Sequence, residues 1–348
     1  MDEIELQTPA IINDDFLNKK GLCGLANLGN SCFMNSIIQC LNNTRPLMEY
    51  ILTLQYKEDL NEDEDLNEFI DYWYDMSRNL WNKNSVYVPD NFFRKMQILS
   101  NQKNRELSGF GQSDSHEFLQ FFLEIFQEAI STNVEMNIEG NPSNNFDKLV
   151  IEAYKSYQRF FENDFSFIIE NFYGQFYTQI NTLTGDKNEL SNSFEPFNTM
   201  SLEIWNSEQP LTIYNLLDKF VEPEKIIDTQ EKIIIKETCF WTLPNILIIY
   251  FKRFDNNSNK LSDMIDFPLV DLDMSKYVKG FNRQSYTYDL YAVSHHSGNC
   301  NGGHYWATVK NNNGNWYKFN DNVVSTTTMS DIVSRSSFVL FYKKHDLI

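Results

Sequence analysis

The sequence predicts an α+β protein, with helices in the first third of the chain and strands in most of the remainder. Before about residue 131, apolar residues recur at helical spacing. From about residue 165 they alternate or run continuously, as they do in strands. A run of helices followed by a run of strands favours this fold class. The 348 residues, 42% hydrophobic and 15% aromatic, are enough to bury a substantial core.

Three segments carry the helical prediction. The first helix runs from about Ser31 to Asn42, and the second covers the acidic, amphipathic segment 57–76. The third covers 113–130, where one apolar stripe is continuous along the segment. Asp114 and Glu117 have the spacing of a capping box, with aspartate at the N-cap.

Polar and apolar patterns divide the remainder into a loop and several strands. Residues 131–148 are polar, and we expect a loop there. Residues 245–254 form a near-continuous apolar run, which is typical of a buried strand. Further strands are expected in segments that alternate or that flank the hairpin signal NNNGN, namely 285–298, 302–310, 315–321 and 336–344.

Charge and cysteine usage exclude several classes of protein. A formal net charge of -19 opposes binding to phosphate backbones, so we expect no nucleic-acid partner. The first twenty residues contain five carboxylates, and the longest apolar run lies in 246–251, so we expect neither a signal peptide nor a membrane span. The five cysteines contain no CxxC pair. We therefore expect free thiols, no metal, no cofactor and a cytoplasmic or nuclear protein.

Cys32 is the first candidate for chemistry. It follows a glycine-bounded turn and begins a predicted helix, where unpaired N–H groups and the helix dipole stabilise a thiolate. Asn27, five residues earlier, has an amide that could donate to a developing oxyanion. The alternative is that Cys32 is a buried small apolar residue, as we expect for Cys23 and Cys40.

His304 is the candidate base, because it follows two glycines at the start of a predicted strand. A third group must orient it. A two-residue turn at 313–314 would place Val323 opposite His304, with Asp321 on the same face. A longer loop or a bulge would place Asn320 directly opposite. Either side chain could accept a hydrogen bond from imidazole Nδ1–H. The alternative is a merely polar hairpin end.

Several segments together resemble the ubiquitin-specific proteases, in that family's order and over roughly 21–344. GLANLGNSCFMNSIIQCL (24–41) resembles their cysteine box, and GFGQSDSHEFL (109–119) resembles their glutamine–aspartate segment. LPNILIIYFKRF (243–254) resembles the strand before the histidine box. The histidine box itself is matched by HSGNCNGGHYWATV (296–309), WYKFND (316–321) and FVLFY (338–342).

The resemblance implies a papain-like cysteine peptidase fold with a helical thumb, a palm built on an antiparallel sheet, and fingers. It implies ubiquitin and ubiquitinated proteins as partners, and a monomer. The expected domains are a polar extension, 1–20, and a catalytic domain, 21–348. Within the catalytic domain, about 21–165 is expected to form mainly the thumb. About 166–250 is expected to form the fingers and part of the palm, and 251–348 the rest of the palm.

The resemblance also implies roles for individual residues. Cys32 would be the nucleophile, His304 the general base and Asn320 the third triad member. Asp321 would be its neighbour, able to substitute, and Asn27 would donate to the oxyanion. Two further groups would bind the ubiquitin tail: Gln112, Asp114 and Glu117 on the helix, and His296, Gly303 and Tyr305 around the tail channel.

The chain departs from the family pattern in two places. Ser31 stands where the family has threonine before the nucleophile. Many members carry two zinc-binding CxxC pairs in the fingers, whereas 178–191 and 228–241 contain only Cys239. We therefore expect zinc-free fingers held by strand pairing.

The implied activity is hydrolysis of the bond after the C-terminal glycine of ubiquitin, through a thioester on Cys32. Three alternatives are a peptidase for another ubiquitin-like modifier, a non-catalytic ubiquitin-binding scaffold, and a general papain-type endopeptidase. The missing secretory signal and the match of 109–119 argue against the last of these.

Overall fold

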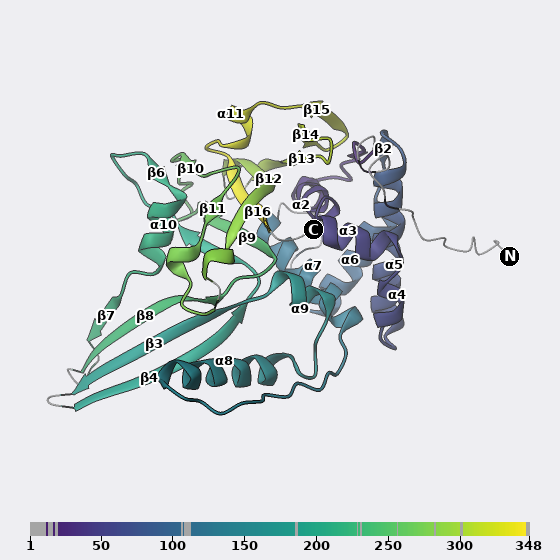
Figure 1. Ribbon diagram of the computed structural model, residues 1–348. Coiled ribbons are helices and arrows are strands. Elements are labelled where there is room, and N and C mark those ends of the chain that lie inside the picture. The colour runs from purple at the N-terminus through teal and green to yellow at the C-terminus, as the bar shows by residue number, and fades with distance from the viewer. Residues whose placement is uncertain are drawn as a thin grey trace. The chain divides into compact units, whose positions relative to one another are not determined.

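Helices precede strands, as the sequence predicts, and the α+β class is confirmed (Figure 1). The computed structural model describes residues 12, 17, 20–105, 107, 113–184, 187–227, 229, 232–255, 257–281, 283–299 and 302–345. Two compact units form. The first contains the chain up to Ser131, together with Tyr291–Ile332 and Ser336–Phe338. The second contains Thr132–Leu290, Val333–Arg335 and the residues from Val339 onward.

The first unit combines a helical region with an antiparallel sheet. Its helices are α2 (Cys32–Asn42), α3 (Arg45–Leu52), α4 (Tyr56–Asp59), α5 (Glu64–Asn82), α6 (Asp90–Gln102), α7 (Ser115–Ile130) and α11 (Met329–Ile332). Two short strands, β1 (Gly24–Leu25) and β2 (Val86–Tyr87), pair in parallel. The antiparallel sheet has the order β15 (Val323–Thr326), β14 (Trp316–Asn320), β13 (Gly302–Lys310) and the end of β12 (Thr287–Asn299).

Aromatic side chains fill the helical core of the first unit. The Trp73 ring of α5 lies 4.7 Å from the Phe122 ring of α7, and Phe69 and Phe92 pack around them. Every residue of α2 is buried, and α2 contacts both α7 and β13. Because a fully buried helix must satisfy its polar side chains internally, each polar residue of α2 needs a partner within the fold.

The acidic segment 57–76 is not one helix, contrary to the prediction. It contains α4 and most of α5, which are separated because Asp63 caps α5. The Asp63 side chain accepts hydrogen bonds from the backbone N–H groups of Asp65 at 3.0 Å and Leu66 at 3.1 Å. An N-cap has extended backbone, which interrupts the preceding helix. Helical residues lie on both sides of the cap, as the periodicity predicts, and Asp63 fixes the start of α5.

The second unit is mainly β-structure. Its principal sheet has the order β4 (Lys187–Phe197), β3 (Gly174–Thr184), β8 (Ile233–Thr242) and β7 (Glu224–Ile227). Elsewhere β9 (Ile246–Lys252) pairs antiparallel with β16 (Ser337–Lys344) and parallel with β5 (Met200–Glu203). Smaller elements are α9 (Phe167–Phe172), α10 (Ile213–Phe220), β6 (Leu211–Thr212), β10 (Ile265–Asp266), β11 (Leu272–Asp273) and the 3₁₀ turns η1 (Ser275–Tyr277) and η2 (Arg283–Ser285).

Helix α8 (Asn145–Phe161) lies along the four-stranded sheet (Figure 1). Ala153 packs there against Tyr177, Phe194 and Trp241. The predicted loop 131–148 is therefore wrong at its end. Asn144 caps α8 by accepting a hydrogen bond from the Asp147 backbone N–H at 2.9 Å, so a polar run begins a helix.

Strand β9 is buried along most of its length, which confirms the expectation from its apolar run. Among the described residues, no helix combines the length and the hydrophobicity that crossing a bilayer requires.

Candidate active site

Cys32 is the first residue of α2, as predicted. The preceding turn needs left-handed backbone, with φ of +89° at Gly29 and +54° at Asn30. The Ser31 hydroxyl accepts a hydrogen bond from the Leu28 N–H at 2.9 Å, which braces this turn. Cys23 and Cys40 are buried as expected, but Cys32 is also only 4% exposed. Burial alone therefore does not distinguish the candidate nucleophile from the structural cysteines.

The environment of Cys32 opposes ionisation in the ligand-free protein. Burial raises the pKa of the thiol above its ordinary value of 9.0, because it disfavours the charged form. A hydrogen bond from the Tyr305 backbone N–H lowers the pKa, and the negative charge of Asp321 raises it. Burial is the largest of these effects, so the thiol form is favoured at neutral pH.

We expect alkylation of Cys32 by iodoacetamide to be slow at pH 7 and to keep rising with pH beyond the ordinary thiol pKa of 9.0. Only the thiolate reacts, and its raised pKa moves its formation to higher pH. Peptide mapping, with Cys32→Ala as the control, assigns the rate to this cysteine. A rate that levels off below pH 7 would contradict the expectation and indicate a preformed thiolate.

His304 lies near the start of β13 and is oriented by Asn320, the last residue of β14. Its Nε2 lies 2.5 Å from Asn320 Oδ1. The expected bond through Nδ1 is therefore wrong. With Nε2–H donating to the amide oxygen, Nδ1 keeps its lone pair and can accept a proton.

The register of the β13–β14 hairpin explains why Asn320 meets His304. Both predicted registers are wrong. A two-residue turn would pair Ala307 with Asn320, whereas the structure pairs Ala307 with Phe319. The loop contains three residues and is closed by Asn311 N–H bonding Asn315 O at 2.9 Å, with Gly314 at φ +82°. Because side chains alternate, this one-residue shift puts Asn320 rather than Asp321 on the face of His304.

Asp321 has different partners. Its two carboxylate oxygens accept hydrogen bonds from Asn27 Nδ2 at 2.9 Å and from Asn35 Nδ2 at 2.8 Å. Asn27 Oδ1 accepts from the N–H groups of Gly29 and Ser31. Asn27 is exposed, whereas Asn35 is 3% exposed. The sequence analysis missed Asn35, although its position one helical turn after Cys32 was a usable signal.

The predicted helix cap at α7 is formed on one side. Asp114 accepts a hydrogen bond from the His116 backbone N–H at 2.7 Å, while the Glu117 side chain is exposed. Burial raises the pKa of Asp114 to about 6 and lowers the pKa of His116 to about 4. Gln112 lies outside the described residues.

We expect Asp114→Asn to stabilise the protein at pH 7 by up to about 3 kcal/mol, because the pKa of Asp114 is raised by about two units and one unit corresponds to about 1.4 kcal/mol. The folded-state pKa of Asp114 is raised from 3.8 to about 6, so this residue lowers stability as pH rises through that range. Asparagine still accepts the cap bond. Urea unfolding at pH 4 and pH 7 measures the gain, which should be mostly lost at pH 4. An equal gain at both values would contradict the assignment to ionisation.

His296, Gly303 and Tyr305 lie together on the β12–β13 hairpin. The His296 and Tyr305 rings pack 4.5 Å apart and are only 3% and 6% exposed. A Cβ added at Gly303 would lie 2.2 Å from His296 Nε2, so the histidine ring occupies the space of a side chain at that position. A residue larger than glycine would therefore displace His296.

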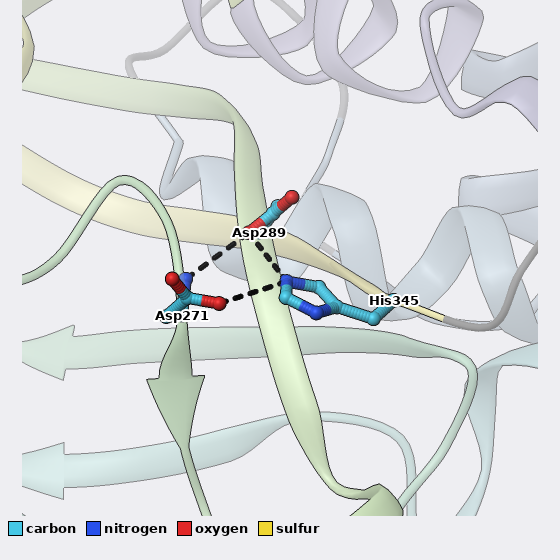
Figure 2. Close-up of side chains that lie close together, drawn as sticks. All are labelled: Asp271, Asp289 and His345. Atoms are coloured by element: carbon cyan, nitrogen blue, oxygen red, sulfur yellow. Dashed lines mark hydrogen bonds and ion pairs between the residues drawn. The ribbon is translucent and has the colours of Figure 1, made fainter.

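Asp271, Asp289 and His345 form the one group of at least three acidic, histidine or cysteine side chains, among the described residues, whose spacing would suit a metal ion. Figure 2 shows the His345 imidazole turned toward both carboxylates. His345 Nε2 lies 2.7 Å from Asp289 and 3.5 Å from Asp271. These polar contacts account for the closeness of the three side chains. It belongs to the second unit, whereas the candidate catalytic residues belong to the first.

A cysteine at a helix N-terminus, packed on a sheet that carries histidine and asparagine, defines the papain-like cysteine peptidase class. The family model for ubiquitin carboxyl-terminal hydrolases matches residues 23–342. The chain belongs to this family.

Two curated relatives extend the comparison. Human ubiquitin carboxyl-terminal hydrolase 2 is 32% identical over 352 residues, covering 94% of this chain and 56% of the relative. Ubiquitin carboxyl-terminal hydrolase Usp2 of Drosophila melanogaster is 31% identical over 341 residues, covering 93% of this chain and 35% of the relative. The chain therefore spans about half, or less, of the length of these relatives.

Solved structures share the fold. The SAGA Ubp8/Sgf11/Sus1/Sgf73 DUB module bound to ubiquitin aldehyde has a TM-score of 0.72 at 24% identity, covering 95% of this chain and 71% of the matched chain. The corresponding module bound to monoubiquitin has a TM-score of 0.70 at 24% identity, covering 99% and 72%. The papain-like fold expected from the sequence is confirmed.

Proposed function

We propose that this chain is a deubiquitinating cysteine protease that hydrolyses the peptide or isopeptide bond after the C-terminal glycine of ubiquitin. The observation that carries the proposal is the His304–Asn320 pair on the strands that face Cys32 at the start of α2. Family membership supports ubiquitin as the modifier. A relative of known structure is bound to ubiquitin aldehyde, which is a ligand with a reactive C-terminus.

The chemistry uses His304 twice. His304 Nδ1 takes the thiol proton, and the Cys32 thiolate attacks the carbonyl carbon of the terminal glycine. The tetrahedral intermediate collapses with cleavage of the C–N bond, and the imidazolium donates its proton to the leaving amine. His304 then takes a proton from water, whose oxygen attacks the thioester carbonyl carbon. The C–S bond breaks, the carboxyl-terminal product leaves, and the imidazolium returns its proton to the Cys32 sulfur. Asn320 holds the imidazole in the required tautomer through both steps.

Asn27 serves as the side-chain donor to the oxyanion in this scheme. Its carbonyl oxygen and one amide hydrogen are already engaged by Gly29, Ser31 and Asp321. Because the amide is planar, these bonds fix the direction of its second N–H. A donor held in advance stabilises the developing charge without reorganisation.

The ubiquitin tail is assigned to two groups of residues. Asp114 and Glu117 at the start of α7, with Gln112, would bind its backbone, and His296, Gly303 and Tyr305 would border its channel. The raised pKa of Asp114 indicates that its charge is unfavourable for folding. Retention of a destabilising carboxylate is typical of a binding residue. Asp114→Asn should therefore raise KM for ubiquitin substrates while it stabilises the fold.

We retain the proposed thumb, fingers and palm, with the four-stranded sheet of the second unit as the fingers. Strand pairing joins β3 to both β4 and β8 along nearly their full length. Of the predicted zinc positions, only Cys239 offers a thiol. Backbone hydrogen bonds and the packing of α8 thus supply the order that zinc provides elsewhere.

Chelation is expected to leave the protein unchanged. After dialysis against EDTA, the Tm and the rate of ubiquitin hydrolysis should match those of untreated protein, because no zinc holds the fingers. Thermal unfolding and a fluorogenic ubiquitin substrate provide the two measurements. Loss of either property, restored by Zn²⁺, would overturn the zinc-free proposal.

The proposed compartment is the cytoplasm or nucleus, and the proposed state is a monomer. The described cysteines, Cys23, Cys32, Cys40 and Cys239, are all free thiols, which suits a reducing compartment.

Reaction with ubiquitin carrying a C-terminal electrophile tests the proposed function. We expect a single adduct, mapped to Cys32, that is absent in Cys32→Ala and slow in His304→Ala. Binding of ubiquitin without an adduct would favour a non-catalytic scaffold. Reaction only with a probe built on another ubiquitin-like protein would keep the chemistry and replace the substrate.

A further inference from the structure

The hydrogen bonds of Asp321 connect two asparagines from different parts of the first unit. Asn27 lies in the turn before α2, and Asn35 lies within α2, one turn after Cys32. Asp321 follows β14 with left-handed backbone, at φ +50°. Its backbone oxygen also accepts a hydrogen bond from the Leu25 N–H at 2.9 Å. Main chain and side chain thus both hold Asp321 against the segment that precedes Cys32.

The charge of Asp321 needs an explanation, because it raises the pKa of the Cys32 thiol. A negative group near the reaction centre also opposes an oxyanion. A role for the carboxylate in holding neighbouring amides through hydrogen bonds would explain its position. One oxygen holds the Asn27 amide, and Asn35 holds the other oxygen. Asn35 Nδ2 additionally lies 3.3 Å from Ala26 O, in the residue next to Asn27.

We propose that Asn35 is a positioning residue that fixes Asp321, and through it the direction of the Asn27 amide toward the oxyanion. This proposal rests on the proposed function. Asn35 is buried, so water cannot replace Asp321 as the hydrogen-bond partner of its amide. Without Asn35, one carboxylate oxygen loses its donor and Asp321 can turn. Asn27 is exposed and would then sample other directions.

The expected signature is a loss in kcat without a rise in KM. Asn35→Ala should lower kcat for a fluorogenic ubiquitin substrate about tenfold, because small misplacements of a catalytic group are costly to rate. Asn35→Asp keeps the shape but turns an acceptor toward Asp321, and should lose at least as much. Ser36→Ala is the matched control. Ser36 is equally buried and bonds Ser294 instead, so kcat should be unchanged.

A double-mutant cycle separates positioning from general damage. Asn27→Ala should lower kcat about 10²-fold. Adding Asn35→Ala to that variant should cause no further loss, because the group that Asn35 positions is gone. Additive losses in kcat, or an unchanged kcat in Asn35→Ala, would overturn the role proposed for Asn35. The proposed function would still stand if the wild type turns over the substrate. Absence of turnover by the wild-type chain would refute the proposed function and this proposal with it. Thermal unfolding of each variant identifies any that fail to fold.

Discussion

Cys32→Ala is expected to lose all measurable hydrolysis of a fluorogenic ubiquitin substrate, a fall of at least about 10⁴-fold. In the proposed mechanism the Cys32 thiolate forms the covalent intermediate, and no other described cysteine begins a helix. Asn27, His304 and Asn320 remain in place, but they have no nucleophile to activate. Since alanine removes only the sulfur atom at this buried site, the fold and the affinity for ubiquitin should persist.

Cys40→Ala is the matched control for this prediction. Cys40 lies on the same helix and is fully buried. Its burial raises the pKa of the thiol well above the ordinary value, so it is inert at neutral pH. We expect full activity with a modest loss of stability. If Cys32→Ala retained activity and Cys40→Ala lost it, the assignment of the nucleophile would be wrong.

His304→Ala is expected to lower kcat by about 10³- to 10⁴-fold, because in the proposed mechanism every proton transfer passes through its imidazole. The loss should be in kcat rather than KM if His304 acts on the reacting groups and not on ubiquitin binding. Added imidazole should restore part of the rate, since a small base can enter the space left by the side chain. A structural histidine would not be rescued in this way.

His345→Ala is the control for the loss of a histidine. His345 is bound to Asp289 and Asp271 in the second unit and has no assigned part in the reaction. Its removal should leave kcat unchanged and lower stability only slightly, because ion pairs at exposed sites contribute little. An equal loss of kcat in both histidine variants would contradict the role assigned to His304.

Local patterns predicted α2, α5, α7, β9, β12, β13, β14 and β16, and two of the three triad candidates. Cys32 follows a turn that requires left-handed backbone and begins a helix, and both features are visible in the sequence. His304 is the third residue of β13, which begins with two glycines. Such signals depend on neighbours within a few residues, so the sequence displays them directly. The break between α4 and α5 was missed because a capping aspartate within an acidic run has no distinct pattern.

The choice between Asn320 and Asp321 depended on a single residue of hairpin register. The turn sequence NNNGN is compatible with several loop lengths, and the sequence favoured none. The three-residue loop closed by Gly314 set the alternation of β14 and turned Asn320 toward His304. A one-residue change in register moves every side chain of a strand to its other face. The length of the turn therefore decides whether Asn320 or Asp321 faces His304.

The sequence by itself determined the fold class and the family and singled out Cys32 and His304 as candidates, because periodicity, turn chemistry and the order of motifs can be read along the chain. Only the tertiary structure decided that Asn320 orients the histidine and that Asp321 joins Asn27 to Asn35. The two contacts of Asp321 connect residues almost 300 positions apart, whereas His304 and Asn320 are 16 positions apart and meet through the hairpin register. The Asn35–Asp321 bond pairs a buried polar side chain of α2 with a group that only the fold brings beside it.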